Sequence, residues 1–336
     1  MDTLNALIIF GNYILIPALA YGSQLALGAL GVTLIYGILR FSNFAHTELM
    51  AFGTTITIFI TWTLQNAGVS IAPLPTALLA MPIGILITIA LVLSTDKLVF
   101  RHYRKVKAKP LIFMIVSIGL MFFIGGMVRL IIGGKDQIFN DGARFIFSAR
   151  EFKKFTGFDE GLAFKTSQGI TILITFIAVI ALFMFLNHTR VGKAMRAYSD
   201  NENLALLSGI NPERVVMITW ILTGILATLA GVLYGLDKSF KPFIYMQLLL
   251  PIFASAIVGG IGSPLGAIAG GYLIAFSEVA ITFAYKKFFT YLLPDALAPN
   301  TLWQILSTEY KFAVSFVILV IVLLIRPQGI FKGKSL

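Results

Sequence analysis

Two ionisable side chains, His46 and Glu48, lie in the polar stretch Asn43-Phe44-Ala45-His46-Thr47-Glu48, between two apolar blocks. Ionisable groups among apolar segments are costly unless they face the interior of a helix bundle or a water-filled path. There they could hold a broken segment in shape or line a route for a polar solute. The alternative is a solvated turn at the membrane surface, because Arg40 places a positive charge nearby. Asn43, His46 and Glu48 are therefore candidate pathway residues.

A second candidate region surrounds a break in a later apolar run. The run between Gln247 and Phe283 is interrupted by Gly259-Gly260-Ile261-Gly262-Ser263-Pro264, through which a helix cannot pass smoothly. Non-helical backbone at membrane depth is tolerated only where it is buried in protein or lines a water-filled path. We therefore predict a broken or re-entrant helix, or a tight hairpin, and the pathway candidates here are Gly259, Gly260 and Gly262.

Other polar residues and glycines in these blocks could join helices. Glu278 lies inside the last glycine-rich segment, and with Gln24 and Gln247 it could make polar contacts between helices. Gln24 and Glu278 are therefore added to the pathway candidates. The four-residue spacing of Gly262, Gly266 and Gly270 lets another helix approach closely, so these three serve either helix packing or the pathway.

Catalytic motifs do not assemble in this sequence. His102 and His188 lie at loop edges beside basic residues, and neither H-E-x-x-H nor G-x-S-x-G occurs. With no cysteine there is no thiolate metal site. We assign no catalytic and no metal-binding residue, and we expect a protein that is not an enzyme.

The composition indicates which elements position these residues. Of 336 residues, 58% are hydrophobic and 12% charged, whereas soluble domains average about 25% charged. Separate apolar segments of about 20 residues can each cross a hydrocarbon layer about 30 Å thick. The sequence predicts an all-α, polytopic bundle of about eight spans, forming one transmembrane domain over residues 1–336. The first block, 7–39, is either one span divided near Pro17 or two short passes, and we favour one span.

Charge placement predicts the sidedness of the loops. The net charge of +11 includes a basic run from Arg101 to Lys109 without an acid. Such a run is typical of a cytoplasmic loop. It therefore accounts for the positive charge without a nucleic-acid partner, and we expect lipid to surround the spans. The loop at 134–167 is then outside and the coupling loop at about 188–214 inside. The basic tail, with Arg326, Lys332 and Lys334, is also predicted to be cytoplasmic.

The inner loop has helix signals of its own. Ser199 and Glu202 have the spacing of a capping box, and Gly209 is a stop signal. Asn211 and Pro212 then restart a helix. Such a short helix is marginal unless its apolar face docks on a partner or on lipid. Its apolar residues are Leu204, Ala205, Leu206 and Leu207.

Several stretches occur in a characteristic order. They are Gly31-Val-Thr-Leu-Ile-Tyr-Gly37 with 43–48, Arg196-Ala-Tyr-Ser-Asp-Asn-Glu-Asn-Leu-Ala205 with 209–214, Gly224 to Gly235, Gly259 to Ser263, and Ser307-Thr-Glu-Tyr310 to Arg326-Pro-Gln-Gly329. Together they resemble the LivH-type permease subunits of branched-chain amino acid ABC importers, over nearly the whole chain.

The resemblance implies an importer half-channel in a bacterial-type cytoplasmic (inner) membrane. It implies a second permease, such as a LivM-like paralogue, two cytoplasmic ATPase subunits that hold ATP and Mg, and a soluble substrate-binding protein. This chain would need no cofactor of its own. The coupling loop would contact the ATPases through Arg196, Glu202, Leu204, Ala205, Leu206, Leu207 and Gly209. The alternatives are an ion-coupled secondary transporter or channel acting alone, an ABC permease for urea or a short amide, and an integral membrane enzyme.

Overall fold

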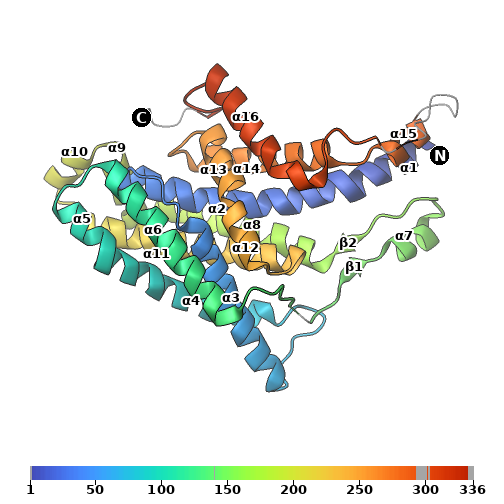
Figure 1. Ribbon diagram of the computed structural model, residues 1–336, viewed down its shortest axis with the longest axis horizontal. Coiled ribbons are helices and arrows are strands. Elements are labelled where there is room, and N and C mark those ends of the chain that lie inside the picture. Colours follow the sequence, from blue (N-terminus) through green and yellow to red (C-terminus); the bar gives the residue numbers. More distant parts are fainter. Residues whose placement is uncertain (1, 140, 293–300, 302, 332–336) are drawn as a thin grey trace.

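The computed structural model describes residues 2–139, 141–292, 301 and 303–331. In these residues, long apolar helices form an elongated bundle with a small two-stranded sheet (Figure 1). The described residues include eight helices that are long and apolar enough to cross a membrane: Asp2–Leu39, Ala77–Lys105, Pro110–Ile132, Thr166–His188, Pro212–Lys238, Pro242–Gly259, Pro264–Thr282 and Thr308–Ile325. The prediction of an all-α polytopic bundle is confirmed.

The first span is one continuous helix, made of α1 (Asp2–Phe10), a π-helical turn (Gly11–Leu15) and α2 (Ile16–Leu39). The chain therefore crosses once here rather than in two short passes. The irregular turn lies just before Pro17, whose ring cannot donate the backbone hydrogen bond that a regular turn needs. At 1.5 Å per residue the helix is about 57 Å long, so it extends well beyond a hydrocarbon layer of about 30 Å.

The centre of the bundle is α2. Every residue from Ala20 to Ile35 is buried. Four other helices pack on it: α8 (Thr166–His188), α11 (Pro212–Lys238), α13 (Leu249–Gly259) and α14 (Pro264–Thr282). Glycines allow this close approach; for example, Gly22 lies against the ring of Tyr272. Because lipid tails are as apolar as the side chains, such close packing is a main source of helix association.

A second group of helices packs around α3 (His46–Asn66). Its neighbours are α4 (Ala77–Thr95), α6 (Pro110–Ile132), α11 and α12 (Pro242–Gln247). Threonines line α3, and the hydroxyls of Thr54, Thr57 and Thr61 donate to carbonyl oxygens one turn earlier. Hydroxyls satisfied within their own helix can be buried at low cost, which lets this comparatively polar helix lie inside the bundle.

The basic segment after α4 is more helical than expected. The helix continues from α4 through a π-helical turn (Asp96–Phe100) into α5 (Arg101–Lys105), within the basic run that we expected to be a loop. The Arg104 guanidinium donates two hydrogen bonds to the Asp96 carboxylate, of 2.5 and 3.0 Å. A paired carboxylate explains how the acid at position 96 can be buried at the edge of the membrane.

The break at 259–264 is a tight helical hairpin, one of the forms that we expected. The chain ends α13 at Gly259 and turns with positive φ at Gly260 (113°) and Gly262 (85°). A Cβ atom at Gly266 would overlap the Gly259 carbonyl group, and one at Gly270 would overlap the Ser255 carbonyl. The two later glycines therefore serve helix packing, whereas Gly262 lies in the turn and does not share their helical face.

A C-terminal segment completes the hairpin. After α16 (Lys311–Ile325), which follows a 3₁₀ turn (Thr308–Tyr310), the chain returns to the end of α13. The amides of Ile330 and Phe331 donate to the carbonyls of Val258 and Gly259, at 2.9 and 3.0 Å. These carbonyls have no partner within their own helix, so the tail caps it. Lys332 and Lys334 of the predicted cytoplasmic tail lie outside the described residues.

The two ends of the bundle carry different structures (Figure 1). One end holds α5, α9 (Arg190–Asp200) and α10 (Glu202–Leu207), and the opposite end holds the N-terminus and the 145–165 hairpin. That hairpin consists of β1 (Phe145–Phe147), α7 (Ala149–Thr156) and β2 (Phe164–Lys165). The structure thus places the predicted outer and inner loops at opposite ends.

Polar contacts stabilise the end of the bundle that bears the 145–165 hairpin. The Glu160 carboxylate accepts a hydrogen bond from Tyr291 (2.8 Å) and pairs with Lys287 (2.7 Å), both on α15 (Lys286–Leu292). The hydrogen bond to Glu160, together with burial, raises the pKa of Tyr291 to about 12. Asn5 of α1 donates to Asp159. These contacts join the loop at 134–167 to the first helix and to α15.

The chain contains no cysteine, so single cysteines can test this sidedness directly. We expect Ser208→Cys, beside α10, to react with a membrane-impermeant maleimide only from the cytoplasmic side. Arg150→Cys, on α7, should react only from outside. Labelling of both from the same side of intact cells would contradict the arrangement.

Candidate functional site

The segment between α2 and α3 re-enters the bundle. Arg40 ends α2 with a left-handed conformation (φ 58°), and the Asn43 side-chain oxygen accepts from the Ala45 amide at 3.2 Å. The Phe44 amide donates to the Ser117 hydroxyl of α6 at 3.1 Å. Because these groups replace helix hydrogen bonds, the non-helical backbone can lie inside the protein. The polar stretch is therefore a buried entry to α3 and not a solvated turn.

His46 is packed against a glycine of the central helix. Its side chain is fully buried, and a Cβ atom at Gly31 would overlap the imidazole ring. The two sequence stretches that contain Gly31 and His46 are thus one packing unit. The glycine leaves space for the ring, and the ring fixes where α3 starts relative to α2.

Glu48 has a partner that sequence reasoning missed. Its carboxylate is 1% exposed and lies 3.6 Å from the guanidinium of Arg129 on α6. Gly125, one turn before Arg129, gives it room, since a Cβ there would be 2.9 Å from the carboxylate. The Arg129 guanidinium also lies over the ring of Phe243, 4.8 Å from its centre. One Glu48 oxygen has no hydrogen-bond partner among the described residues.

Glu278 occupies a different site. Its carboxylate accepts a hydrogen bond from Ser315 of α16, and the Lys311 ammonium lies over the ring of Tyr21, 5.3 Å from its centre. Glu278 therefore ties α14 to α16, whereas Glu48 ties α3 to α6. We found no sequence signal for Ser315 or Lys311 as neighbours of Glu278, because they come from a distant apolar helix.

The two glutamines expected near Glu278 make other contacts. Gln24 donates to the Leu233 carbonyl of α11 at 3.4 Å. Gln247 is exposed at the end of α12. It borders an open, mostly apolar groove of about 490 Å³, lined also by Phe44, Met246, Leu249, Leu250, Phe253, Ile257 and Phe312. Phe44 stacks on Phe253 at this groove, 5.2 Å between ring centres, so the groove adjoins the re-entrant segment.

The predicted coupling loop at about 188–214 has two helices where we expected one, and we call the end of the bundle that holds them the inner end after that prediction. The missed helix is α9, capped by Thr189, whose hydroxyl accepts from the Gly192 amide at 2.9 Å. The predicted capping box is wrong, because Ser199 lies in α9 and Asn201 caps α10 by accepting from Leu204 at 3.1 Å. Asparagine offers the same acceptor as serine, two residues later. The stop at Gly209 (φ 79°) is confirmed.

The apolar residues of α10 divide between two faces. Leu204, Leu206 and Leu207 are 60%, 42% and 85% exposed. Ala205 is 3% exposed, so it anchors α10 and cannot belong to a docking face as we expected. Glu202 accepts a hydrogen bond from Tyr198 at 2.7 Å. Burial of Tyr198 and this hydrogen bond raise the pKa of its phenol and fasten α10 to α9.

A latch joins α9 to the end of α2. The Ser199 hydroxyl donates to the Gly37 carbonyl at 2.9 Å, and the Arg40 guanidinium donates to the Ser199 carbonyl at 2.5 Å. Gly37 has one of the last carbonyls of α2, which lack helical partners. The latch, formed by Gly37, Arg40 and Ser199, therefore connects α9 to the re-entrant segment between α2 and α3.

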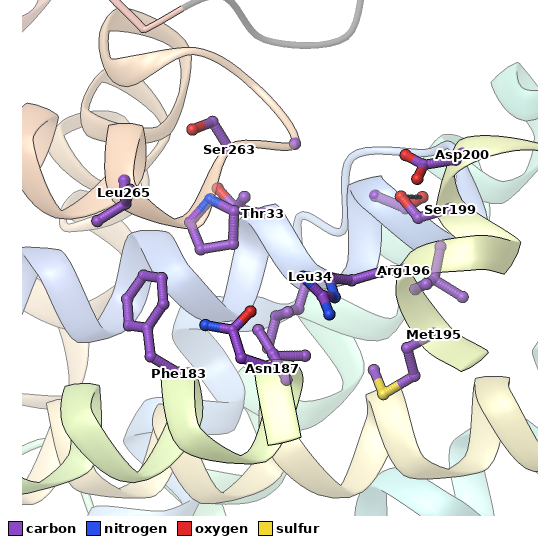
Figure 2. A pocket seen from close by; sticks show the side chains of 15 residues that line it. Thr33, Leu34, Phe183, Asn187, Met195, Arg196, Ser199, Asp200, Ser263 and Leu265 are labelled. Atoms are coloured by element: carbon purple, nitrogen blue, oxygen red, sulfur yellow. Dashed lines mark hydrogen bonds between the residues drawn. The ribbon is translucent and has the colours of Figure 1, made fainter. Parts of the chain in front are cut away.

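A cavity of about 280 Å³ lies beside the latch (Figure 2). It is an open cavity lined by residues of α2, α8, α9 and the hairpin turn at 262–265. Arg196 lines it, whereas none of the α10 leucines does. Gly262 also lines it, whereas Gly259 and Gly260 are covered by the C-terminal segment. In the part of the chain that the structure describes, no group of three His, Asp or Glu side chains could hold a metal ion.

Neighbouring glycines on α6 test the position of Glu48. We expect Gly125→Ala to lower the thermal unfolding temperature of the purified protein by several degrees, because the methyl group displaces a buried, paired carboxylate. Gly126→Ala is the matched control, since no atom lies within 4 Å of its Cβ position apart from its chain neighbours and the backbone of its own helix. Equal unfolding temperatures for the two variants would contradict the packing described.

Comparison with known proteins places the whole architecture in one family. The family model for the branched-chain amino acid transport system permease component matches residues 14–323. The high-affinity permease protein LivH of Salmonella typhimurium is 34% identical over 315 residues, 92% of this chain and 91% of that protein. BraD of Pseudomonas aeruginosa is 29% identical over 319 residues, 94% of each chain. A probable LivH of Methanocaldococcus jannaschii is 30% identical over 318 residues, 94% of this chain and 91% of the other.

No solved structure matches the chain significantly. The resemblance that we based on sequence motifs is confirmed by the family model and by these relatives. With eight candidate spans among the described residues and a family match over most of its length, the chain is a multi-pass membrane protein that belongs to the branched-chain amino acid transport system permease family.

Proposed function

We propose that this chain is the permease subunit of an ATP-driven importer for branched-chain or related amino acids. The relatives are named as permeases of branched-chain amino acid transport, which supports this solute class. The observation that carries the proposal is the α10 face, where Leu204, Leu206 and Leu207 are exposed. This helix lies at the same end of the bundle as the basic helix α5 (Figure 1). A short helix with exposed leucines needs a partner, and separate ATPase subunits that hold ATP and Mg are the partner we propose.

The latch supports a mechanical route from such ATPases into the bundle. Force on α10 would act on α9 through Glu202 and Tyr198. From α9 it would pass to α2 and to Arg40 through Ser199. The re-entrant segment begins there and ends at His46. In this mechanism, ATP-driven closure of the ATPases shifts the segment and alternates access between outward-open and inward-open forms.

The apolar groove supports a paired arrangement of two permeases. It is open at Leu250 and Gln247 and adjoins Phe44. In our proposal a second permease, such as a LivM-like paralogue, faces this groove, and the solute passes between the two half-channels near 43–48. A binding protein would deliver the solute at the end that bears the 145–165 hairpin. The other candidate pathway residues would then support the walls of the path without contacting the groove. They are Asn43, Glu48, Glu278, Gln24 and the hairpin glycines.

Buried carboxylates favour one alternative. Glu48 has an unpaired oxygen among the described residues and Glu278 lies near Lys311, as an ion- or proton-coupled carrier would require. Such a carrier would transport when reconstituted alone with an ion gradient, whereas our proposal expects no transport without ATPase subunits. A urea or short-amide permease shares the same architecture in our proposal. Competition by urea against leucine in uptake assays distinguishes these two solute classes.

The α10 face gives the first test of the proposal. We expect Leu206→Asp to abolish co-purification of the ATPase subunits while the protein still inserts into the membrane, because a charge enters a face that must be desolvated. Val69→Asp is the control, since Val69 is 42% exposed and lies in the loop after α3. Normal ATPase association of the Leu206→Asp protein would refute the docking assignment.

The latch gives a second test. Hydrogen bonds to charged groups contribute about 1.5–3 kcal/mol, so we expect Arg40→Ala to lower ATP-dependent uptake roughly tenfold or more. ATPase subunits should still co-purify, because the α10 leucines are untouched. Arg40→Lys should restore part of the uptake, since an ammonium can still reach a carbonyl. Unchanged uptake by the Arg40→Ala protein would show that coupling does not use the latch.

A further inference from the structure

The 145–165 hairpin extends one end of the bundle beyond the spans, and we call this end the outer end after the predicted outer loop (Figure 1). The segment that leads into α8 runs along the first helix. The Asn12 side chain accepts a hydrogen bond from the Ala163 amide at 3.0 Å, and Asn5 donates to Asp159. With 23 residues, α8 is about 34 Å long, enough to cross a hydrocarbon layer of about 30 Å. The outer surface of that layer therefore lies near Asn12 on the first helix.

This geometry places α7 in water rather than among lipid headgroups. Asn5 lies two helical turns before Asn12, and therefore about 10 Å farther out along the first helix. The headgroup layer adds only about 5–7 Å on each side of the hydrocarbon. Figure 1 shows α7 level with the N-terminus, so this helix lies beyond the headgroups.

Polar contacts hold the hairpin against α1 and α15, and they engage all of its acids. Each of its three carboxylates accepts a hydrogen bond within the chain; the pairs are Ser148 with Glu151, Asn5 with Asp159, and Tyr291 with Glu160. A surface that is held rigid loses less conformational freedom when a partner docks on it. The hairpin is therefore a prepared surface and not a loose loop.

Two basic residues of α7 have no such contacts. Arg150 and Lys154 are exposed and one helical turn apart, so they share a face of α7. Among the described residues, neither makes a hydrogen bond or an ion pair. Lys154 acts on Glu151 only at longer range, adding to the hydrogen bonds from Ser148 that lower the pKa of this acid. Phe155, the next residue, is 93% exposed. Arginines and aromatic residues are enriched at protein interfaces.

The basic residues of this loop differ from the usual distribution in membrane proteins. An excess of Lys and Arg normally marks cytoplasmic loops, yet the predicted outer loop at 134–167 contains six: Lys135, Arg144, Arg150, Lys153, Lys154 and Lys165. Since these charges do not favour the predicted topology, those exposed on α7 indicate a binding role. A cationic face beyond the headgroups fits an acidic protein surface in the outer compartment.

We propose that α7 docks the soluble binding protein, which presents an acidic surface to Arg150 and Lys154 and an apolar contact to Phe155. The binding protein is the partner that approaches from this side in the proposed function, on which this inference rests. Opposite charges guide its approach and fix its orientation over the bundle. Attraction of this kind raises association rates by about 10- to 1000-fold and weakens as salt is added.

The test uses the complete transporter, with both permeases and the ATPases, in proteoliposomes of phosphatidylethanolamine and phosphatidylglycerol that hold ATP inside and binding protein outside. The unchanged transporter comes first, because absent ATP-dependent uptake would refute the proposed function and this inference with it. In the double variant Arg150→Glu/Lys154→Glu, we expect the binding-protein concentration for half-maximal uptake to rise about tenfold. Maximal uptake should stay the same, and the difference should shrink at high salt.

Lys135→Glu is the matched control, because Lys135 is an exposed lysine of the same loop that lies outside the hairpin. Its half-maximal concentration should not change. An equal rise in Lys135→Glu, no rise in the double variant, or a loss of maximal uptake in the double variant would overturn the proposal. A rise that disappears when phosphatidylcholine replaces phosphatidylglycerol would assign α7 to lipid headgroups and also overturn it.

A second measurement needs no charge reversal. Binding protein added outside should protect Arg150→Cys, in the otherwise cysteine-free chain, from a membrane-impermeant maleimide, and labelling should return when the binding protein is washed away. Full labelling of Arg150→Cys at a binding-protein concentration that saturates uptake would contradict docking on α7.

Discussion

The structure depends on the requirement that every backbone amide and carbonyl inside a membrane finds a partner within the protein. Helices satisfy this requirement except at their ends, and in the described part of the chain the start of α3 and the end of α13 are buried. At each place a distant helix or segment supplies partners, and Asn43 adds one from within its own segment. The side chains of Ser117 and Asn43 accept hydrogen bonds from amides of the re-entrant segment. The amides of Ile330 and Phe331 donate hydrogen bonds to the end of α13. The non-helical segments are thereby held by contacts whose rearrangement can move them.

The same requirement links the inner helices to the core. The last carbonyls of α2 need donors, and Ser199 of α9 provides one. A capping bond is thus also a mechanical connection between a cytoplasmic helix and the central helix. The small residues on α2 and α14, such as Gly22 and Gly271, keep these helices in contact along their length, so a displacement at one end is carried along a stiff element.

Much of the fold could be predicted from local sequence. Long apolar segments specify spans because length and hydrophobicity are local properties, and the 259–264 stretch specifies a break because glycine and proline act on their own backbone. The sequence could not pair Glu48 with Arg129 or His46 with Gly31, because those contacts come from packing between distant helices. The cap of α10 was misassigned since Ser199 and Asn201 are both good caps, and only tertiary contacts engage the serine elsewhere.

The central claim is that separate ATPase subunits and a second permease complete this chain. The most direct measurement is affinity purification of the chain from its native cells in a gentle detergent, with mass spectrometry of the proteins that accompany it. The account predicts P-loop ATPases and a second permease in stable proportion to the chain. Recovery of the chain alone, under conditions that keep known membrane complexes together, would contradict it.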